Sequence, residues 1–299
     1  MGAIDVWAQQ VGPRMAREPW LATLLRWTGK DAAEMAPGID LTLARMDAAG
    51  VDLALLSAWY GPGGPLITND EVRAAVEHAP TRFRGLLGVD LRDPVRAART
   101  VRELAGDVFV GVRVVPWLWE LPPDHRLYYP VYTACVEAGV PLCTQIGHTG
   151  PLKTSETGRP IPYLERVLLD FPDLVVVGGH VGFPWLDEVV TLTVKFPNFY
   201  VDTSAYALDR LPAAFLDYAR TLGRRRVMFG TNWPMIDPVR ALRDLAGLSW
   251  DEELRTDFLS GTARRVFRLP DAPDTAVRAR TPSIRGCAHT SRTASDVRG

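Results

Sequence analysis

Short apolar runs alternate with stretches of helical periodicity between residues 3 and 269. The apolar runs predict buried parallel strands, and several of them end in polar groups and glycine. These runs lie at 3–9, 51–57, 83–90, 109–115, 141–150, 174–180, 199–204 and 226–232. The stretches between them predict helices at 41–49, 69–78, from 94, 129–138, 160–171, 184–196, 211–222 and within 238–268.

Local signals indicate several boundaries of these elements. Gly50 is expected to stop one helix, Asn69 to cap the next, and Pro184 to stand in a first helical turn. Residues 11–38 have no clear period, so we expect an insertion that folds over the end of the first strand. Residues 59–64 combine aromatic side chains with glycines and are expected to form a flexible loop.

Eight strand–helix repeats with connections of ordinary length are typical of a (β/α)₈ barrel, the TIM-barrel form of the α/β class. The alternative is a doubly wound open sheet. That fold usually carries a glycine-rich turn after its first strand, and this turn is absent from the sequence. We therefore predict one barrel over residues 1–269.

The composition changes after residue 269. Residues 270–299 are rich in Pro, Ala, Thr, Ser and Arg and contain almost no large apolar side chains. Such a segment cannot bury enough apolar surface to offset the entropy of ordering. The sequence therefore predicts a disordered C-terminal tail over 270–299.

Charge and composition narrow the class of protein. The 299 residues are 47% hydrophobic with a formal net charge of −1, which gives no reason to expect nucleic-acid binding. No apolar run is long enough to span a membrane, and the N-terminus lacks the pattern of a secretory signal. Three widely spaced cysteines argue against a disulfide framework. We expect a cytoplasmic protein that binds neither nucleic acid nor membranes.

The ends of the predicted strands carry most of the groups that could perform chemistry. In a barrel, side chains at the carboxyl ends of the strands converge on one pocket. The residues so placed are Asp5, Trp7, Gln9, Trp59, Tyr60, Asp90, Arg113, Gln145, His148, His180, Asp202, Asn232 and Trp233. Many of them titrate, donate hydrogen bonds or present an aromatic face, so we expect a ligand pocket.

Each of these residues also has a structural alternative. His148 and His180 could be hydrogen-bonded structural histidines, and Asp202 could cap the turn that follows its strand. Arg113 stands between valines, so it points into the barrel mouth or pairs with a nearby aspartate such as Asp90 or Asp5. Tryptophans such as Trp59 either line the pocket or pack beneath loops.

Five motifs in order resemble the amidohydrolase-related family, in the branch that contains aminocarboxymuconate-semialdehyde decarboxylase and the resorcylate decarboxylases. They are IDV at 4–6, GHVG at 179–182, YVDTS at 200–204, FGTNWP at 229–234 and GTARRVF at 261–267. The resemblance covers residues 3–269 and implies a metal-dependent-hydrolase-like barrel that holds a divalent metal, usually zinc.

The chain departs from that family at most of the positions that the resemblance marks as metal ligands. Trp7 and Gln9 stand in place of a His-x-His pair, and Gln145 in place of a histidine. Asn232 replaces an aspartate. Only His180 matches, with His148 as a second candidate after a small shift. Since neutral amides are weak zinc ligands and an indole is none, no metal is predicted with certainty.

We expect an enzyme that acts on a small carboxylated or cyclic metabolite by hydrolysis or non-oxidative decarboxylation. His148, His180 and Asn232 are the predicted catalytic residues, and Arg113 could orient a carboxylate. The predicted substrate-binding residues are Trp7, Gln9, Trp59, Arg113, Gln145, Asp202 and Trp233.

Two other readings stay open: an inactive ligand-binding member of the family, and a conventional zinc hydrolase that uses both histidines with Asp5 or Asp202. A small-molecule substrate is the expected partner. A homodimer is left open.

Overall fold

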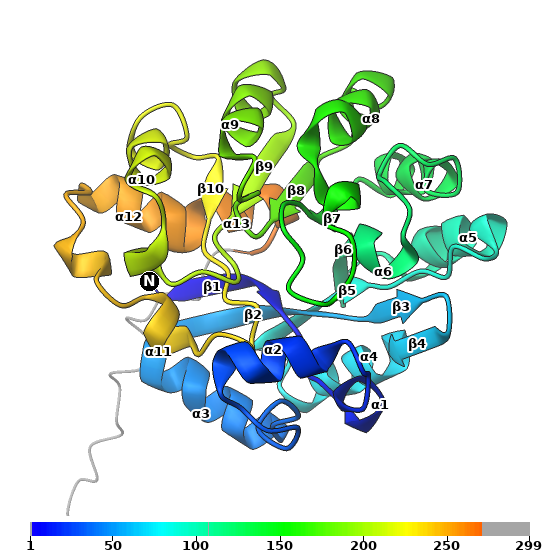
Figure 1. Cartoon of the computed structure of the whole chain (residues 1–299), viewed down its shortest axis with the longest axis horizontal. Coiled ribbons are helices and arrows are strands. Elements are labelled where there is room, and N and C mark those ends of the chain that lie inside the picture. Colours follow the sequence, from blue (N-terminus) through cyan, green and yellow to red (C-terminus); the bar gives the residue numbers. More distant parts are fainter. Residues whose placement is uncertain (1, 107, 271–299) are drawn as a thin grey trace, which may run out of the picture. The chain divides into compact units, whose positions relative to one another are not determined.

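Eight parallel strands form a barrel in the order of the sequence (Figure 1). The computed structural model describes residues 2–106 and 108–270. The strands are β1 (Ala3–Ala8), β2 (Val51–Ser57), β5 (Phe83–Leu87), β6 (Phe109–Val114), β7 (Leu142–Gln145), β8 (Val176–Gly179), β9 (Phe199–Asp202) and β10 (Val227–Met228). The predicted barrel is confirmed.

Hydrogen bonds between the first and last strands close the barrel. The Val6 amide donates to the Phe229 carbonyl at 3.1 Å, and the Asn232 amide donates to the Trp7 carbonyl at 2.7 Å. The Gln9 amide bonds the Trp233 carbonyl at 3.1 Å. These bonds bring the polar ends of β1 and β10 together.

Apolar side chains fill the barrel interior. Ile4, Leu55, Leu86 and Val177 are fully buried there, and Phe267 joins the same cluster from the last helix, α13 (Thr262–Phe267). Burial of apolar surface on this scale is the main stabilising term of the fold. The last family-like motif therefore serves packing against the barrel.

The helices surround the barrel in Figure 1. The longer ones are α2 (Leu21–Thr28), α3 (Ile39–Ala49), α4 (Asn69–His78), α5 (Pro94–Leu104), α7 (Tyr129–Ala138), α8 (Glu165–Asp170), α9 (Leu186–Lys195) and α10 (Ala213–Arg220). The shorter ones are α1 (Pro13–Ala16), α6 (Pro116–Trp119), α11 (Pro238–Ala241) and α12 (Glu252–Thr256), with 3₁₀ turns at Glu156–Gly158, Leu208–Arg210 and Leu245–Gly247 and π turns at Pro160–Leu164 and Asp257–Gly261. As expected, Gly50 ends α3 in the left-handed conformation at φ 68°.

The predicted insertion at 11–38 and the predicted loop at 59–64 both contain regular structure. The 11–38 insertion contains α1 and α2, and residues 59–64 begin a hairpin of β3 (Trp59–Gly61) and β4 (Gly64–Ile67). The sequence does not reveal α1 or β3, because elements of four and three residues are too short to show a period in their apolar positions.

The helix predicted over 69–78 has these bounds in the structure, but its capping residue and the start of α9 differ from the prediction. Thr68, not Asn69, caps α4, through a capping box with Glu71. The Asn69 side chain instead exchanges two hydrogen bonds with the backbone of Gly88, at 3.0 and 2.9 Å. Pro184 precedes α9, which starts at Leu186, because its segment forms a turn.

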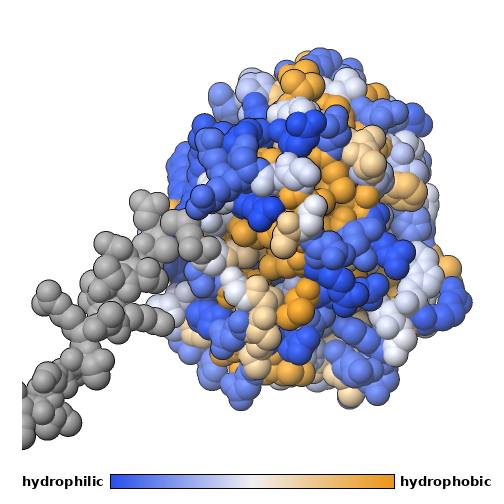
Figure 2. All heavy atoms as spheres, turned by 90° about the vertical axis from the view of Figure 1, so that its left-hand side faces the viewer, coloured by the Kyte–Doolittle hydropathy of each residue, from blue (hydrophilic) through white to orange (hydrophobic). Residues whose placement is uncertain are grey.

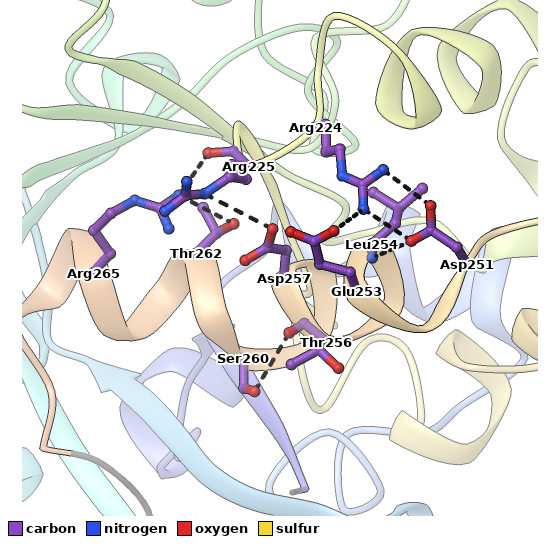
Figure 3. Close-up of polar contacts among 10 residues, drawn as sticks. All are labelled: Arg224, Arg225, Asp251, Glu253, Leu254, Thr256, Asp257, Ser260, Thr262 and Arg265. Carbon is purple, nitrogen blue, oxygen red and sulfur yellow. Dashed lines mark hydrogen bonds and ion pairs between the residues drawn. The ribbon is translucent and has the colours of Figure 1, made fainter.

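Ion pairs on the outside connect the turn before β10 to the last helices (Figure 3). Arg224 bonds Asp251 and Glu253 at 2.9 and 2.8 Å, while Arg265 donates to the Arg225 carbonyl at 2.9 Å. Asp251 and Glu253 are exposed and Arg224 is half-buried, so each of these two ion pairs contributes at most about 1 kcal/mol.

The outer face drawn in Figure 2 is mostly hydrophilic, with apolar residues visible between the polar ones. Within the described part of the chain, no helix is long and apolar enough to cross a bilayer. The predicted tail lies outside the described residues except for Pro270, so it stays a prediction.

Candidate functional site

A cavity of about 590 Å³ lies at the carboxyl ends of the barrel strands. Its lining includes Trp7 near the end of β1 and Gln9 just after it, Gln145 as the last residue of β7, His180 after β8 and Asn232 after β10. This is the position at which barrel enzymes hold their active sites. The sequence-based expectation of one pocket at the strand ends is therefore matched by a cavity.

Aromatic side chains form much of the cavity wall. The five tryptophans that line it are Trp7, Trp20, Trp27, Trp59 and Trp117. Trp20 is parallel to Trp59 at 6.5 Å between ring centroids and meets Trp117 edge-on at 5.0 Å. Ring faces arranged in this way suit a flat apolar ligand.

The cavity has a positive bias in its side chains. Among the described residues, no Asp or Glu lines the cavity, whereas Arg210 and Arg240 both line it. The contact of Arg210 with its neighbour Asp209 is long, at 3.8 Å, and the Arg210 side chain is 72% exposed. The guanidinium groups at the mouth are therefore available to an anionic ligand.

His180 lies at the floor of the cavity in an unusual backbone conformation. His180 and the next residue, Val181, have φ values of 75° and 62°. A β-branched residue rarely adopts a positive φ, and such strain gathers at functional sites. The strained backbone at the end of β8 therefore marks this strand end as a candidate functional position.

The His180 imidazole is held between two neighbours. Its Nδ1 is 2.6 Å from the Ser204 hydroxyl oxygen, and its ring centroid is 4.9 Å from that of Trp7. Removal from water lowers the pKa of His180 to about 3, with a further contribution from the Arg113 charge. The imidazole is therefore neutral at physiological pH and acts as a hydrogen-bonding group.

Gln9 and Asn232 join the first and last strand ends. The Gln9 Nε2 group donates to the Asn232 Oδ1 at 2.9 Å and also to the Trp233 carbonyl. Asn232 has a φ of 65°. The Gln9 Oε1 is buried and has no hydrogen-bond partner among residues 2–106 and 108–270. An acceptor of this kind is available to a donor on a ligand.

Gln145 and His148 form one side of the site. Gln145 donates through Nε2 to the His148 carbonyl at 3.0 Å, which fixes the loop after β7. The His148 ring stacks on Trp27 with 5.6 Å between centroids and an interplanar angle of 17°. His148 is exposed and also lines the cavity, so its imidazole is accessible both to solvent and to a bound ligand.

Three of the residues predicted to bind substrate lie away from the cavity wall. The Arg113 guanidinium is buried behind Trp7 and donates to the Ser57 hydroxyl at 2.7 Å. Asp202 accepts from the Ser204 amide at 2.9 Å, and burial raises its pKa to about 6. The Trp233 indole donates to Thr42 at 3.1 Å. Direct contact with substrate is therefore not supported by the positions of these three.

The other aspartates named from the sequence have structural partners. Asp5 accepts hydrogen bonds from the amide of Thr231 at 2.9 Å and of Trp7 at 3.1 Å, within the barrel closure. Asp90 pairs with Arg92 at 2.5 Å, outside the cavity lining. Neither aspartate pairs with Arg113, so that alternative is wrong.

The residues present do not fit the divalent metal that the resemblance implies. In the part of the chain that the structure describes, no three His, Cys, Asp or Glu side chains come together as a ligand set. The Nδ1 of His180 is engaged by Ser204, and the Gln9 Oε1, unpartnered within the described residues, is a neutral amide oxygen, which is a weak zinc ligand. Zinc sites need about three His, Cys, Asp or Glu ligands.

The sequence reasoning missed several lining residues. Trp20 and Trp27 belong to the insertion after the first strand, and its tryptophans were the available signal. Arg210 and Arg240 follow the seventh and eighth strands in segments without a motif. Only the folded chain brings these arginines to the same mouth.

Comparisons with known proteins match most of the chain. The family model described as Amidohydrolase matches residues 9–269. A gamma-resorcylate decarboxylase of Polaromonas sp. is 24% identical over 248 residues, which cover 67% of this chain and 75% of that protein.

Two solved structures support the same barrel fold. An uncharacterized TIM-barrel protein from Bordetella bronchiseptica matches with a TM-score of 0.78 and 24% identity, over 90% of this chain and 99% of that one. The 5-carboxyvanillate decarboxylase from Sphingomonas paucimobilis matches with a TM-score of 0.66 and 22% identity, over 90% and 99%.

Proposed function

The chain belongs to the amidohydrolase family, and from that premise we propose an enzyme that acts on a small carboxylated aromatic or cyclic metabolite, by non-oxidative decarboxylation or by hydrolysis. One observation carries the proposal. The cavity combines five tryptophans with two arginines and, among the described residues, no lining carboxylate. That chemistry favours a flat apolar body with a negative charge.

The walls supply most of the binding energy in this proposal. A ring packed against Trp20, Trp59 and Trp117 gains about 25 cal/mol for each Å² of apolar area removed from water. Arg210 and Arg240 attract the carboxylate and favour its approach. The names of the decarboxylase relatives, which act on aromatic acids, agree with this substrate class.

Decarboxylation is the reaction that the lining residues favour. The bond between the ring carbon and the carboxylate breaks, carbon dioxide leaves, and the ring carbon takes a proton. His148 lines the cavity and reaches solvent, so it is the proposed proton donor. His180, which is neutral, would instead hold an oxygen of the substrate by a hydrogen bond.

Hydrolysis is the second candidate, because the amides at the floor could hold a carbonyl oxygen. Gln9, Gln145 and Asn232 all line the cavity. The attacking water would need a base, and His148 is the lining residue with access to solvent. The hydrolytic chemistry in the name of the family is consistent with this reading.

The test is turnover of a panel of aromatic and cyclic carboxylic acids by the purified chain. We expect carbon dioxide to be released and a ring proton to replace the carboxylate. Proton NMR detects this new ring proton. Consumption of a lactone or amide without carbon dioxide would assign hydrolysis. Tight binding without any turnover would make the chain a ligand-binding member of the family.

Metal content separates the remaining alternative. Elemental analysis of the active protein is expected to find less than one divalent ion per chain, because the ligand set is incomplete. Stoichiometric zinc, with activity lost to a chelator and restored by zinc, would instead make the chain a conventional zinc hydrolase.

We propose a cytoplasmic location as well, because Cys135 and Cys143 are buried and free within the described chain. The proposed partner is the small-molecule substrate. A second copy of the chain is the other proposed partner, to be tested by sedimentation of the full-length protein.

A further inference from the structure

We infer that Arg113, acting through the ring of Trp7, gives the cavity floor a permanent positive charge that replaces the charge of a metal ion. This inference rests on the proposed function, since it concerns how the same cavity holds a carboxylate. Arg113 is a positioning residue here, because Trp7 separates it from the cavity. The ligand class is an aromatic carboxylate.

Trp7 fills the space at the end of the first strand. Its side chain is 1% exposed, and its ring lies against the end of β8. A Cβ atom at Gly179 would overlap the ring, and one at Gly230 would stand 3.2 Å from the Trp7 Cβ. These two glycines make room for an indole at the strand ends. The volume is therefore occupied by a side chain that cannot bind a metal.

Arg113 lies against the ring of Trp7. The guanidinium carbon is 3.6 Å from the ring centroid, which is a close cation–π contact. The same group donates to the Ser57 hydroxyl at 2.7 Å and to the Val6 carbonyl at 3.2 Å. Strands β1, β2 and β6 thus hold the guanidinium and the indole in one fixed arrangement.

The charge of Arg113 is not neutralised by an ion pair. Asp202 and Asp5 influence it only through space, and within the described ranges neither carboxylate is within bonding distance of it. The group is 2% exposed. Burial without a partner carboxylate is costly, so a protein that keeps such a cation has a use for its field.

The field of Arg113 acts on the cavity floor. It contributes to keeping the His180 imidazole neutral, and it would attract a carboxylate placed against Trp7 and His180. Arg210 and Arg240 attract the anion at the mouth, whereas Arg113 lies at depth. The described part of the chain, in which no metal ligand set comes together, therefore still has a cation beneath the site.

The experiment compares benzoate with benzamide, which share a shape but differ in charge. Binding of both to the full-length protein is measured by calorimetry at neutral pH, before and after dialysis against a chelator. The wild type should prefer benzoate, and chelation should leave the preference unchanged. Arg113→Met should reduce benzoate affinity on the order of tenfold and leave benzamide affinity within about twofold.

Arg113→Lys should keep most of the preference for benzoate, because it retains the charge. Arg73→Met is the matched control: its guanidinium also lies over a ring, at 5.2 Å from the centroid of Phe109, but that ring, unlike Trp7, does not line the cavity. That variant should bind both probes like the wild type.

Several results would overturn the inference. Equal losses for both probes in Arg113→Met would assign a merely structural role. If Arg113→Met still prefers benzoate, the preference comes from the arginines at the mouth. If chelation removes the preference from the wild type, the preference comes from a metal, and this test does not depend on the folding of Arg113→Met. If the wild type binds both probes equally, only the inference about Arg113 is rejected. If it binds neither probe, the proposed function is rejected as well.

Discussion

The imidazole of His148 lies nearly parallel to the indole of Trp27, with 5.6 Å between the ring centroids. Trp27 comes from α2, in the insertion after the first strand, and His148 from the loop after β7. The two rings thus connect α2 to the loop after β7. Because both line the cavity, their stack fixes where the proposed proton donor stands.

Trp27→Ala should lower turnover without unfolding the chain. The side chain of Trp27 is 58% exposed, so its removal costs little core packing. Loss of the stack frees His148 to adopt other rotamers, and we expect kcat to fall roughly tenfold, as a misplaced proton donor would give. The checks are kcat with the best acid of the panel and the melting temperature. Leu152→Ala, at an 80% exposed position, is the control.

The two histidines of the site should separate in their effects. His148→Ala removes the proposed proton donor and should lower kcat about a hundredfold or more, while benzoate still binds. His180→Ala removes a hydrogen-bonding group at the floor, and we expect mainly weaker binding. His78→Ala is the control, since that side chain is exposed and lies 4.0 Å from Asp40. Full activity in either site variant would contradict the assignment.

The sequence was sufficient for the barrel and for most of its floor. Several strands end in polar groups, and this regularity predicts that His180, Gln145 and Asn232 share one cavity, as they do. Residues such as Arg210 carry no such regularity, because they lie in turns whose place depends on the whole fold.

Direction within a strand was the harder problem. The pattern around Arg113 placed it on a barrel strand, but whether its guanidinium met a ligand or a ring depended on the bulk of Trp7. Trp7 fits between Arg113 and the cavity because Gly179 and Gly230 have no side chains there, and this proximity is visible only in the folded chain.

Gly179→Ala should displace Trp7. A Cβ at this position would overlap the ring, which has a backbone strand on one side and the Arg113 guanidinium against it. Overpacking of this kind costs about 1–3 kcal/mol. We expect a lower melting temperature together with loss of the benzoate preference. Gly12→Ala is the control, since nothing lies within 4 Å of a Cβ there. A variant with the stability and binding of the wild type would show that Trp7 moves freely.

The stability of the chain should depend on pH through Asp5. This carboxyl is buried in the barrel closure, and burial raises its pKa from 3.8 to about 7 despite hydrogen bonds from Thr231 and Trp7. The folded chain therefore binds a proton more tightly than the unfolded chain. The contribution of Asp5 is fully present below about pH 4 and is lost as the pH rises through about 7.

Asp5→Asn should remove that dependence. An amide keeps an acceptor for the two backbone amides and can donate to the Thr231 hydroxyl, so the variant resembles the protonated acid. Denaturant unfolding at a series of pH values gives the free energy of unfolding of both proteins. The variant should gain on the wild type by a few kcal/mol between about pH 4 and pH 7. Asp202, whose pKa is also raised and whose charge contributes to the rise at Asp5, is present in both proteins, so most of its own titration cancels in the difference. A difference that stays constant across this range would mean that Asp5 is ionised in the folded chain, with its charge stabilised by the hydrogen bonds of the barrel closure.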